Sequence, residues 1–145
     1  MTAFVFSDIV DGLMARMSGR SSRFGAFLDS TLDRFGDAAV FGGLVLWYAG
    51  RGDSLPLTAL ALYCLVLGSI TSYARARAEA LGMRANVGIA ERSDRLVAIL
   101  VMTGLAGIFD LPVLIPVTLA ALAVASSVTV LQRVLLVRSQ ALADR

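Results

Sequence analysis

The sequence predicts an all-α integral membrane protein, a polytopic bundle of transmembrane helices that forms one domain over residues 1–145. Hydrophobic residues make up 57% of the chain, which exceeds the share typical of soluble domains. Residues 54–74 and 111–132 are uncharged stretches of 21 and 22 residues. A helix needs about 20 apolar residues to cross a bilayer, so each stretch predicts a full span.

The remaining apolar segments are shorter than a span. Residues 25–50 predict a helix with carboxylates at its inner end, because the uncharged part of this segment is too short to cross alone. Residues 96–109 are also short, so we expect their helix to include Arg92 and Arg95. Residues 1–7 are apolar but too few to cross, and we interpret them as the inner end of a span.

The charges are distributed unevenly along the chain. All 13 basic residues are arginines, set against 11 acids, for a net charge of +2. This excess is too small to indicate a nucleic-acid partner. Arginines concentrate in residues 16–23, 75–95 and 133–145, whereas the turns near Arg51 and Asp110 hold one and none. The positive-inside rule therefore predicts a multi-pass protein of the cell membrane with its arginine-rich side in the cytoplasm.

Histidine is absent and there is one cysteine. These counts exclude catalysis by histidine and offer no disulfide or zinc site. Cys64 lies within an apolar run, so its predicted role is packing.

Eight residues at fixed spacing dominate the first part of the chain, in the pattern D-x2-D-G-x2-A-R-x8-G-x3-D-x3-D. On helices, Asp8 and Asp11 share one face, and Asp29 and Asp33 share another. The polar segment 17–24 predicts a turn between antiparallel helices. The two acidic faces can therefore meet as a cluster of four carboxylates.

Such a cluster predicts a metal site. Like charges at close range repel unless divalent cations lie among them, and carboxylates suit Mg²⁺ or Mn²⁺. The alternative is that these acids merely pair helices within the membrane, although four acids without a compensating lysine nearby would be costly for packing alone. Asp37, one turn beyond Asp33, is expected to be the partner of an arginine and not a ligand.

Three arginines recur where the cytoplasmic ends of three predicted helices should meet: Arg75, Arg95 and Arg133. Three guanidinium groups at one depth predict a phosphate site. The alternative is that they are ordinary interfacial arginines, with Arg75 paired to Glu79 and Arg95 to Glu91 at i, i+4 spacing.

The eight-residue pattern matches, without departure, the signature of the CDP-alcohol phosphotransferases, integral membrane enzymes of phospholipid synthesis. The segments Ser72–Glu79 and Glu91–Arg95 make the chain similar to the actinobacterial phosphatidylinositol phosphate synthases, a branch of that family, with Arg75 in place of the usual lysine. The resemblance implies the family's helix bundle, of which this chain would lack the first span and part of the second. It also suggests a homodimer.

The resemblance further implies transfer of a phosphatidyl group from CDP-diacylglycerol to inositol 1-phosphate. Asp8, Asp11, Asp29 and Asp33 would hold Mg²⁺ or Mn²⁺, and Asp33 would also be the catalytic base. Gly12, Arg16 and Ser22 match positions that contact CDP-diacylglycerol. Ser72, Arg75, Arg95 and Arg133 match positions that bind the acceptor phosphate.

Two other functions remain open from the sequence. Phosphatidylglycerophosphate synthases share the signature and use glycerol 3-phosphate, and the arginines argue only moderately against that acceptor. A non-enzymatic membrane protein that binds divalent cations would also need acids, but it would give no reason for the spacing of Gly12, Arg16 and Gly25.

Overall fold

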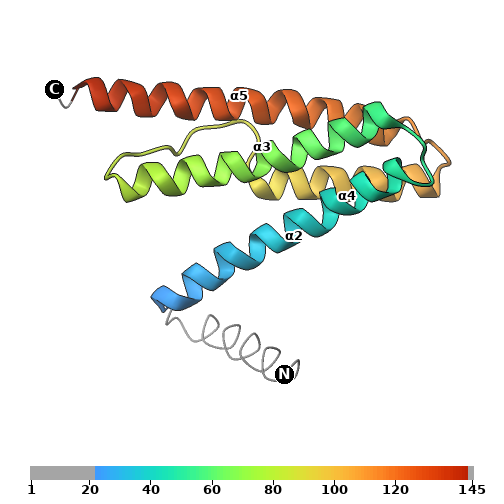
Figure 1. The fold of residues 1–145 in the computed structure, drawn as a ribbon, viewed down its shortest axis with the longest axis horizontal. Coiled ribbons are helices and arrows are strands. Elements are labelled where there is room, and N and C mark those ends of the chain that lie inside the picture. Colours follow the sequence, from blue (N-terminus) through green and yellow to red (C-terminus); the bar gives the residue numbers. More distant parts are fainter. Residues whose placement is uncertain (1–21, 144–145) are drawn as a thin grey trace. The chain divides into compact units, whose positions relative to one another are not determined.

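A computed structural model describes residues 22–143, and Asp8, Asp11, Gly12 and Arg16 lie outside this range. The described residues form four helices: α2 (Arg23–Ala49), α3 (Leu55–Ala80), α4 (Arg92–Ile108) and α5 (Leu114–Ala143) (Figure 1). The chain divides into two compact units, residues 1–36 and 37–145, with the boundary inside α2.

Local signals explain where the helices begin and end. Ser22 precedes α2, and its hydroxyl oxygen accepts a hydrogen bond from the Gly25 amide at 2.9 Å, as an N-cap does. Glu91 precedes α4 and forms a capping box with Asp94. Beyond α3, Gly82 adopts φ +77°, which allows the amides of residues 82 and 83 to reach carbonyl groups in the last turn.

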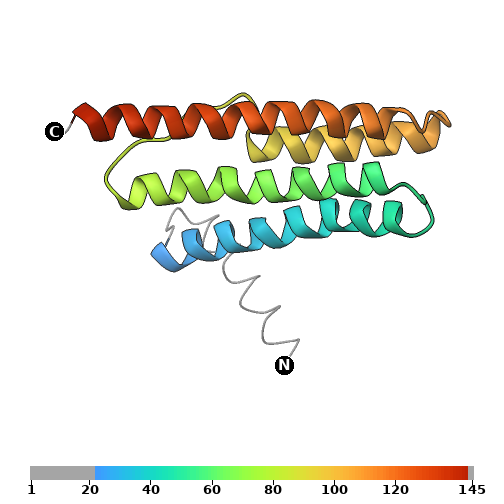
Figure 2. The ribbon, with the colours of Figure 1, turned by 45° about the horizontal axis from the view of Figure 1, so that its top comes forward.

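In the second unit, α5 packs against both α3 and α4. The loop from residue 81 to residue 91 returns alongside α5 (Figure 2). The core contains side chains from the second half of α2 and from all three later helices: Phe41, Tyr48, Ala61, Cys64, Ile99, Leu119, Leu122 and Ala123. Cys64 is buried, and its thiol donates to the Leu119 carbonyl oxygen at 3.3 Å, so the predicted packing role is confirmed.

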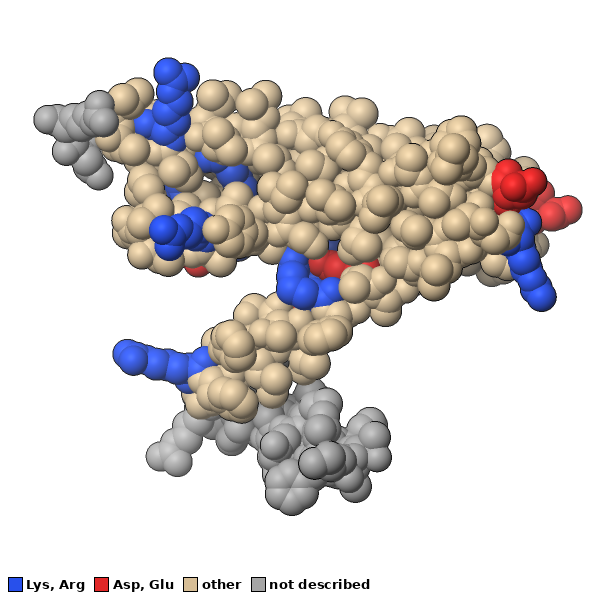
Figure 3. All heavy atoms as spheres, in the orientation of Figure 1, with Lys and Arg blue, Asp and Glu red and all other residues tan. Residues whose placement is uncertain are grey.

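Two of the described helices, α3 and α5, are long and apolar enough to cross a membrane. Many large apolar side chains on the bundle are exposed, and the middle of the α3–α5 region is largely uncharged on the face seen in Figure 3. A soluble protein rarely exposes such continuous apolar surface. The all-helical membrane fold predicted from the sequence is confirmed.

The helices α3 and α5 run further than their predicted spans. Helix α3 continues beyond residue 74 to Ala80, and α5 continues beyond residue 132 to Ala143. Both extensions contain alanine and arginine and lack glycine and proline, so they are good helix formers. Charge ends a hydrophobic span, but it does not end a helix.

Candidate functional site

The described part of the acidic motif lies on the first half of α2. Gly25, Asp29 and Asp33 follow one another at single-turn intervals on this helix, which places them on one face as predicted. Both aspartates are half-buried. The Ser22 hydroxyl caps the same helix, so this side chain has a structural role beside the predicted contact with CDP-diacylglycerol.

The carboxylates of α2 fit a divalent cation by their chemistry. Asp29 and Asp33 offer hard oxygen ligands one turn apart, and such ligands suit Mg²⁺ or Mn²⁺. Among residues 22–143, no three acidic, cysteine or histidine side chains gather as a metal site. The other two predicted ligands, Asp8 and Asp11, precede the described residues.

The three predicted phosphate-binding arginines come from three helices and meet at consecutive turns of α3. The Arg95 guanidinium, from α4, lies beside Gly68. Arg133, from α5, donates through Nη1 to the Thr71 carbonyl oxygen at 2.6 Å. Arg75 is itself on α3, one turn beyond Thr71. We call Arg75, Arg95 and Arg133 the arginine row, and the structure brings its members together along the second half of α3.

Arg95 is 3% exposed and is held between two helices. On one side its Nη2 lies 4.0 Å from Asp37 Oδ2 on α2. On the other side is Gly68, where an added Cβ atom would lie 2.9 Å from Nη1 of Arg95. Asp37 also accepts a hydrogen bond from Nε of Arg92 at 3.1 Å. The prediction that Asp37 is the partner of an arginine is confirmed, and Glu91 caps α4.

Arg133 is buried as well, and it joins three segments. Its Nε donates to the Val87 carbonyl oxygen in the 81–91 loop at 2.9 Å, in addition to the bond with Thr71 on α3. Arg133 therefore holds the loop and α3 to α5.

Arg75 and the neighbouring Ser72 are more exposed to solvent than Arg95 and Arg133. Nε of Arg75 lies 2.9 Å from Glu79 Oε1, and both side chains are about half exposed. This is the i, i+4 pair expected from the sequence, and an exposed pair of this kind contributes little to stability. The Ser72 hydroxyl donates to the Gly68 carbonyl oxygen at 3.2 Å, which places it one turn from Arg95's contact with α3.

Sequence reasoning missed the backbone partners of the row. Gly68 and the carbonyl oxygens of Thr71 and Val87 contact Arg95 or Arg133 across separations of 27 to 62 residues. No local pattern marks a carbonyl oxygen as an acceptor for a distant side chain. Gly68 itself was the one signal of such a contact in the sequence, because glycine in a helix often marks close packing.

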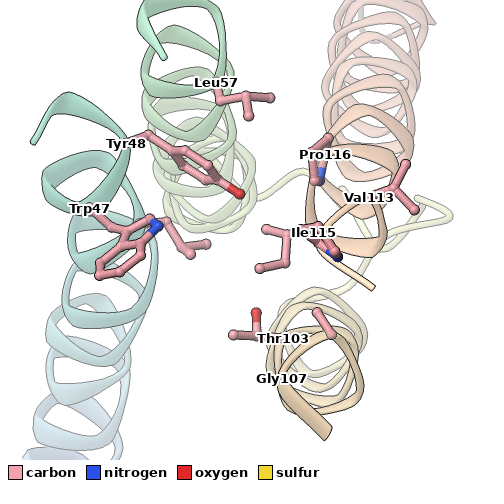
Figure 4. A pocket seen from close by; sticks show the side chains of 11 residues that line it. Trp47, Tyr48, Leu57, Thr103, Gly107, Val113, Ile115 and Pro116 are labelled. Carbon is pink, nitrogen blue, oxygen red and sulfur yellow. The ribbon is translucent and has the colours of Figure 1, made fainter. Parts of the chain in front are cut away.

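A cavity of about 730 Å³ lies at the other end of the second unit. Tyr48 from α2 and Ile115 and Pro116 from α5 face it (Figure 4). Its lining is almost entirely apolar, and it contains no charged side chain. It therefore offers nothing to bind a phosphate, and the candidate site remains at the arginine row.

The CDP-alcohol phosphatidyltransferase family profile matches residues 1–131. The chain belongs to this family. Phosphatidylinositol phosphate synthases are among its relatives: the one from Streptomyces avermitilis is 53% identical over 97% of this chain, and the one from Cutibacterium acnes is 52% identical over 95%. The chain spans 60% and 70% of the lengths of these two curated relatives.

Two crystal structures of the phosphatidylinositol phosphate synthase from Mycobacterium tuberculosis share the fold. One, with CDP-DAG bound, is 43% identical with a TM-score of 0.80, over 92% of this chain and 68% of that one. The other, in complex with manganese and citrate, is 42% identical with a TM-score of 0.78, over 92% of this chain and 65% of that one.

Proposed function

We propose that this family member takes part in the transfer of a phosphatidyl group from CDP-diacylglycerol to inositol 1-phosphate, which yields phosphatidylinositol phosphate and CMP. The observation that carries the proposal is the complete eight-residue signature in a chain that also holds the arginine row along the second half of α3. The relatives at 53% and 52% identity, both phosphatidylinositol phosphate synthases, support the choice of acceptor.

Asp8, Asp11, Asp29 and Asp33 would hold the divalent cation, Mg²⁺ or Mn²⁺. The neighbour in complex with manganese supports a cation of this class. When bound, the ion would neutralise the diphosphate of the donor and the charge on departing CMP. Asp33 would accept the proton of the attacking acceptor hydroxyl, whose oxygen forms the new P–O bond as the bond to CMP breaks.

Gly12, Arg16 and Ser22 would bind the CDP part of the donor. Glycine permits close approach of a ligand to the backbone, and Arg16 offers charge to the diphosphate. Ser22 can still donate its hydroxyl proton while its oxygen caps α2. The neighbour with CDP-DAG bound supports a donor site of this kind in the fold.

Ser72 and the arginine row would bind the phosphate of the acceptor. Arginine suits this task because its guanidinium donates in a fixed fork that matches phosphate oxygens. Arg95 and Arg133 are fixed by burial and contacts, so little conformational entropy would be lost on binding. We further propose that the arginine row faces the cytoplasm, that the enzyme crosses the cell membrane several times, and that it is a homodimer.

The chemistry is tested by CMP release from CDP-diacylglycerol in detergent micelles, with inositol 1-phosphate as the acceptor. Chelation of divalent cations should abolish release, and Mg²⁺ or Mn²⁺ should restore it. Asp33→Asn should lower kcat by about a hundredfold or more, the usual scale for loss of a catalytic base. The Asp53→Asn control alters an exposed turn residue and should leave kcat unchanged. Full activity of Asp33→Asn would exclude the proposed base.

A further inference from the structure

Asp37 is a buried carboxylate outside the eight-residue signature. It is 4% exposed and lies on α2, one turn beyond Asp33. Its two oxygens face two arginines of α4: Oδ1 lies 3.1 Å from Nε of Arg92, and Oδ2 lies 4.0 Å from Nη2 of Arg95. One carboxylate is thus shared between two guanidinium groups that are one turn apart on the same helix.

The Asp37 carboxylate compensates the charge of the guanidinium groups beside it. A buried guanidinium is costly unless a carboxylate and hydrogen bonds compensate its charge. Asp37 supplies such a carboxylate, and its tighter contact, with Arg92, fixes the first turn of α4 against α2. Because Arg95 follows Arg92 by one turn, this contact also fixes the point from which the Arg95 side chain extends.

Helix α3 completes the constraint on Arg95. Gly68 leaves room for the guanidinium directly against the helix backbone, where a Cβ atom would come within 2.9 Å of Nη1. The guanidinium therefore lies between a carboxylate of α2, 4.0 Å from Nη2, and a glycine of α3. The next contacts along α3 belong to the other members of the arginine row, Arg133 at Thr71 and then Arg75.

We propose that Asp37 is a positioning residue that holds Arg95 in the orientation needed to bind the phosphate of the acceptor. This inference rests on the proposed function and adds a residue that acts through Arg95 without touching either substrate. The acceptor phosphate would meet a guanidinium already oriented by Asp37, which reduces the cost of binding. The donor site, by contrast, gains nothing directly from Asp37.

The test measures KM for inositol 1-phosphate and for CDP-diacylglycerol separately in the full chain. Asp37→Asn keeps the shape of the side chain and removes its charge. We expect KM for the acceptor to rise about tenfold, the effect of weakening one charge-assisted contact, while KM for CDP-diacylglycerol changes by less than about twofold. A role confined to folding would alter both constants or neither.

A double-mutant cycle shows whether Asp37 acts through Arg95. In an Arg95→Gln background, Asp37→Asn should raise the acceptor KM by less than about twofold further, because coupled residues are not additive. Asp110→Asn is the matched control, since Asp110 is an exposed turn carboxylate. Full additivity of Asp37→Asn and Arg95→Gln would contradict the proposal.

Should Asp37→Asn fail to fold, Asp37→Glu replaces it. The longer side chain keeps the charge but displaces the carboxylate, and the acceptor KM should rise at least threefold. An unchanged acceptor KM in a folded variant would overturn the role of Asp37 alone. A wild-type enzyme that uses no phosphorylated acceptor would overturn the proposed function instead, so the two failures are distinguishable.

Discussion

Individual arginines of the row are held by different chemistry. Arg133 donates to two backbone carbonyl oxygens, whereas Arg95 faces a carboxylate and packs beside a glycine. Arg75 forms an exposed ion pair with Glu79. Carbonyl oxygens orient a guanidinium without cancelling its charge, so Arg133 keeps a full positive charge for an anion. The row therefore combines two buried members with one that is about half exposed.

Gly68→Ala tests the packing of Arg95 at the level of a single methyl group. The new Cβ atom would lie 2.9 Å from Nη1, at the far end of a flexible side chain. Because the guanidinium is buried, Arg95 must shift from its binding orientation to make room, at some cost in stability. We expect the acceptor KM to rise about three- to tenfold, equivalent to about 0.7–1.4 kcal/mol, while the enzyme still folds.

Gly104→Ala provides the control for this prediction. Gly104 is also in a helix, but a Cβ atom there meets nothing within 4 Å. Alanine is the better helix former, so this variant should melt at the same temperature or higher and keep the wild-type KM. Equal KM values for Gly68→Ala and wild type would show that the position of Arg95 does not affect acceptor binding.

At the scale of elements, helix α5 holds the 81–91 loop through one face. Thr129 Oγ1 accepts hydrogen bonds from the amides of Ile89 and Ala90, each at 3.2 Å. Arg133 binds the Val87 carbonyl oxygen one turn later. Nearer the end of the helix, the Gln140 side chain bonds to both the amide and the carbonyl oxygen of Arg84. These contacts attach the loop along its length, next to the arginine row.

Thr129→Val removes the hydroxyl from this attachment and keeps the shape of the side chain. The buried Ala90 amide would lose its acceptor, and an unsatisfied buried group costs about 1–3 kcal/mol. The free energy of unfolding in detergent should fall by that amount, and the loop should become more sensitive to proteolysis.

The matched control is Thr118→Val, on the same helix. The Thr118 hydroxyl donates to the Leu114 carbonyl oxygen of its own helix, and that carbonyl oxygen lies in the first turn. We expect the unfolding free energy of the Thr118→Val variant to differ from that of the wild type by less than about 0.5 kcal/mol. Equal losses in the two variants would mean that the loop contact does not stabilise the fold.

The helices were predictable from the sequence because each depends on local patterns. Apolar stretches with charged ends predicted the four helices, although α3 and α5 extend 6 and 11 residues beyond the predicted spans, and Asp37 was correctly expected to pair with an arginine. The contacts that fix the row were not predictable, because they join Thr71, Val87 and Gly68 to arginines far along the chain. The capping box between Glu91 and Asp94 was not predicted either.

At the scale of the whole molecule, charge and apolar surface are separated. Helices α3 and α5 expose apolar side chains along lengths sufficient to cross a bilayer, while the arginine row lies along the second half of α3, with two of its three members buried. Under the proposed function, a water-soluble, phosphorylated acceptor reaches the row from the aqueous side, and a lipid donor reaches it from the bilayer. This separation suits a reaction that joins a polar alcohol to a lipid.

The identity of the acceptor is the central claim, and direct competition tests it. Inositol 1-phosphate, free inositol and glycerol 3-phosphate are supplied together at equal concentrations with CDP-diacylglycerol, and the lipid products are measured by mass spectrometry. The arginine row predicts that phosphatidylinositol phosphate dominates and that phosphatidylinositol forms at least about tenfold less, because free inositol lacks the phosphate and its charge-assisted contacts. Dominant phosphatidylglycerol phosphate, or phosphatidylinositol in equal amount, would contradict the account.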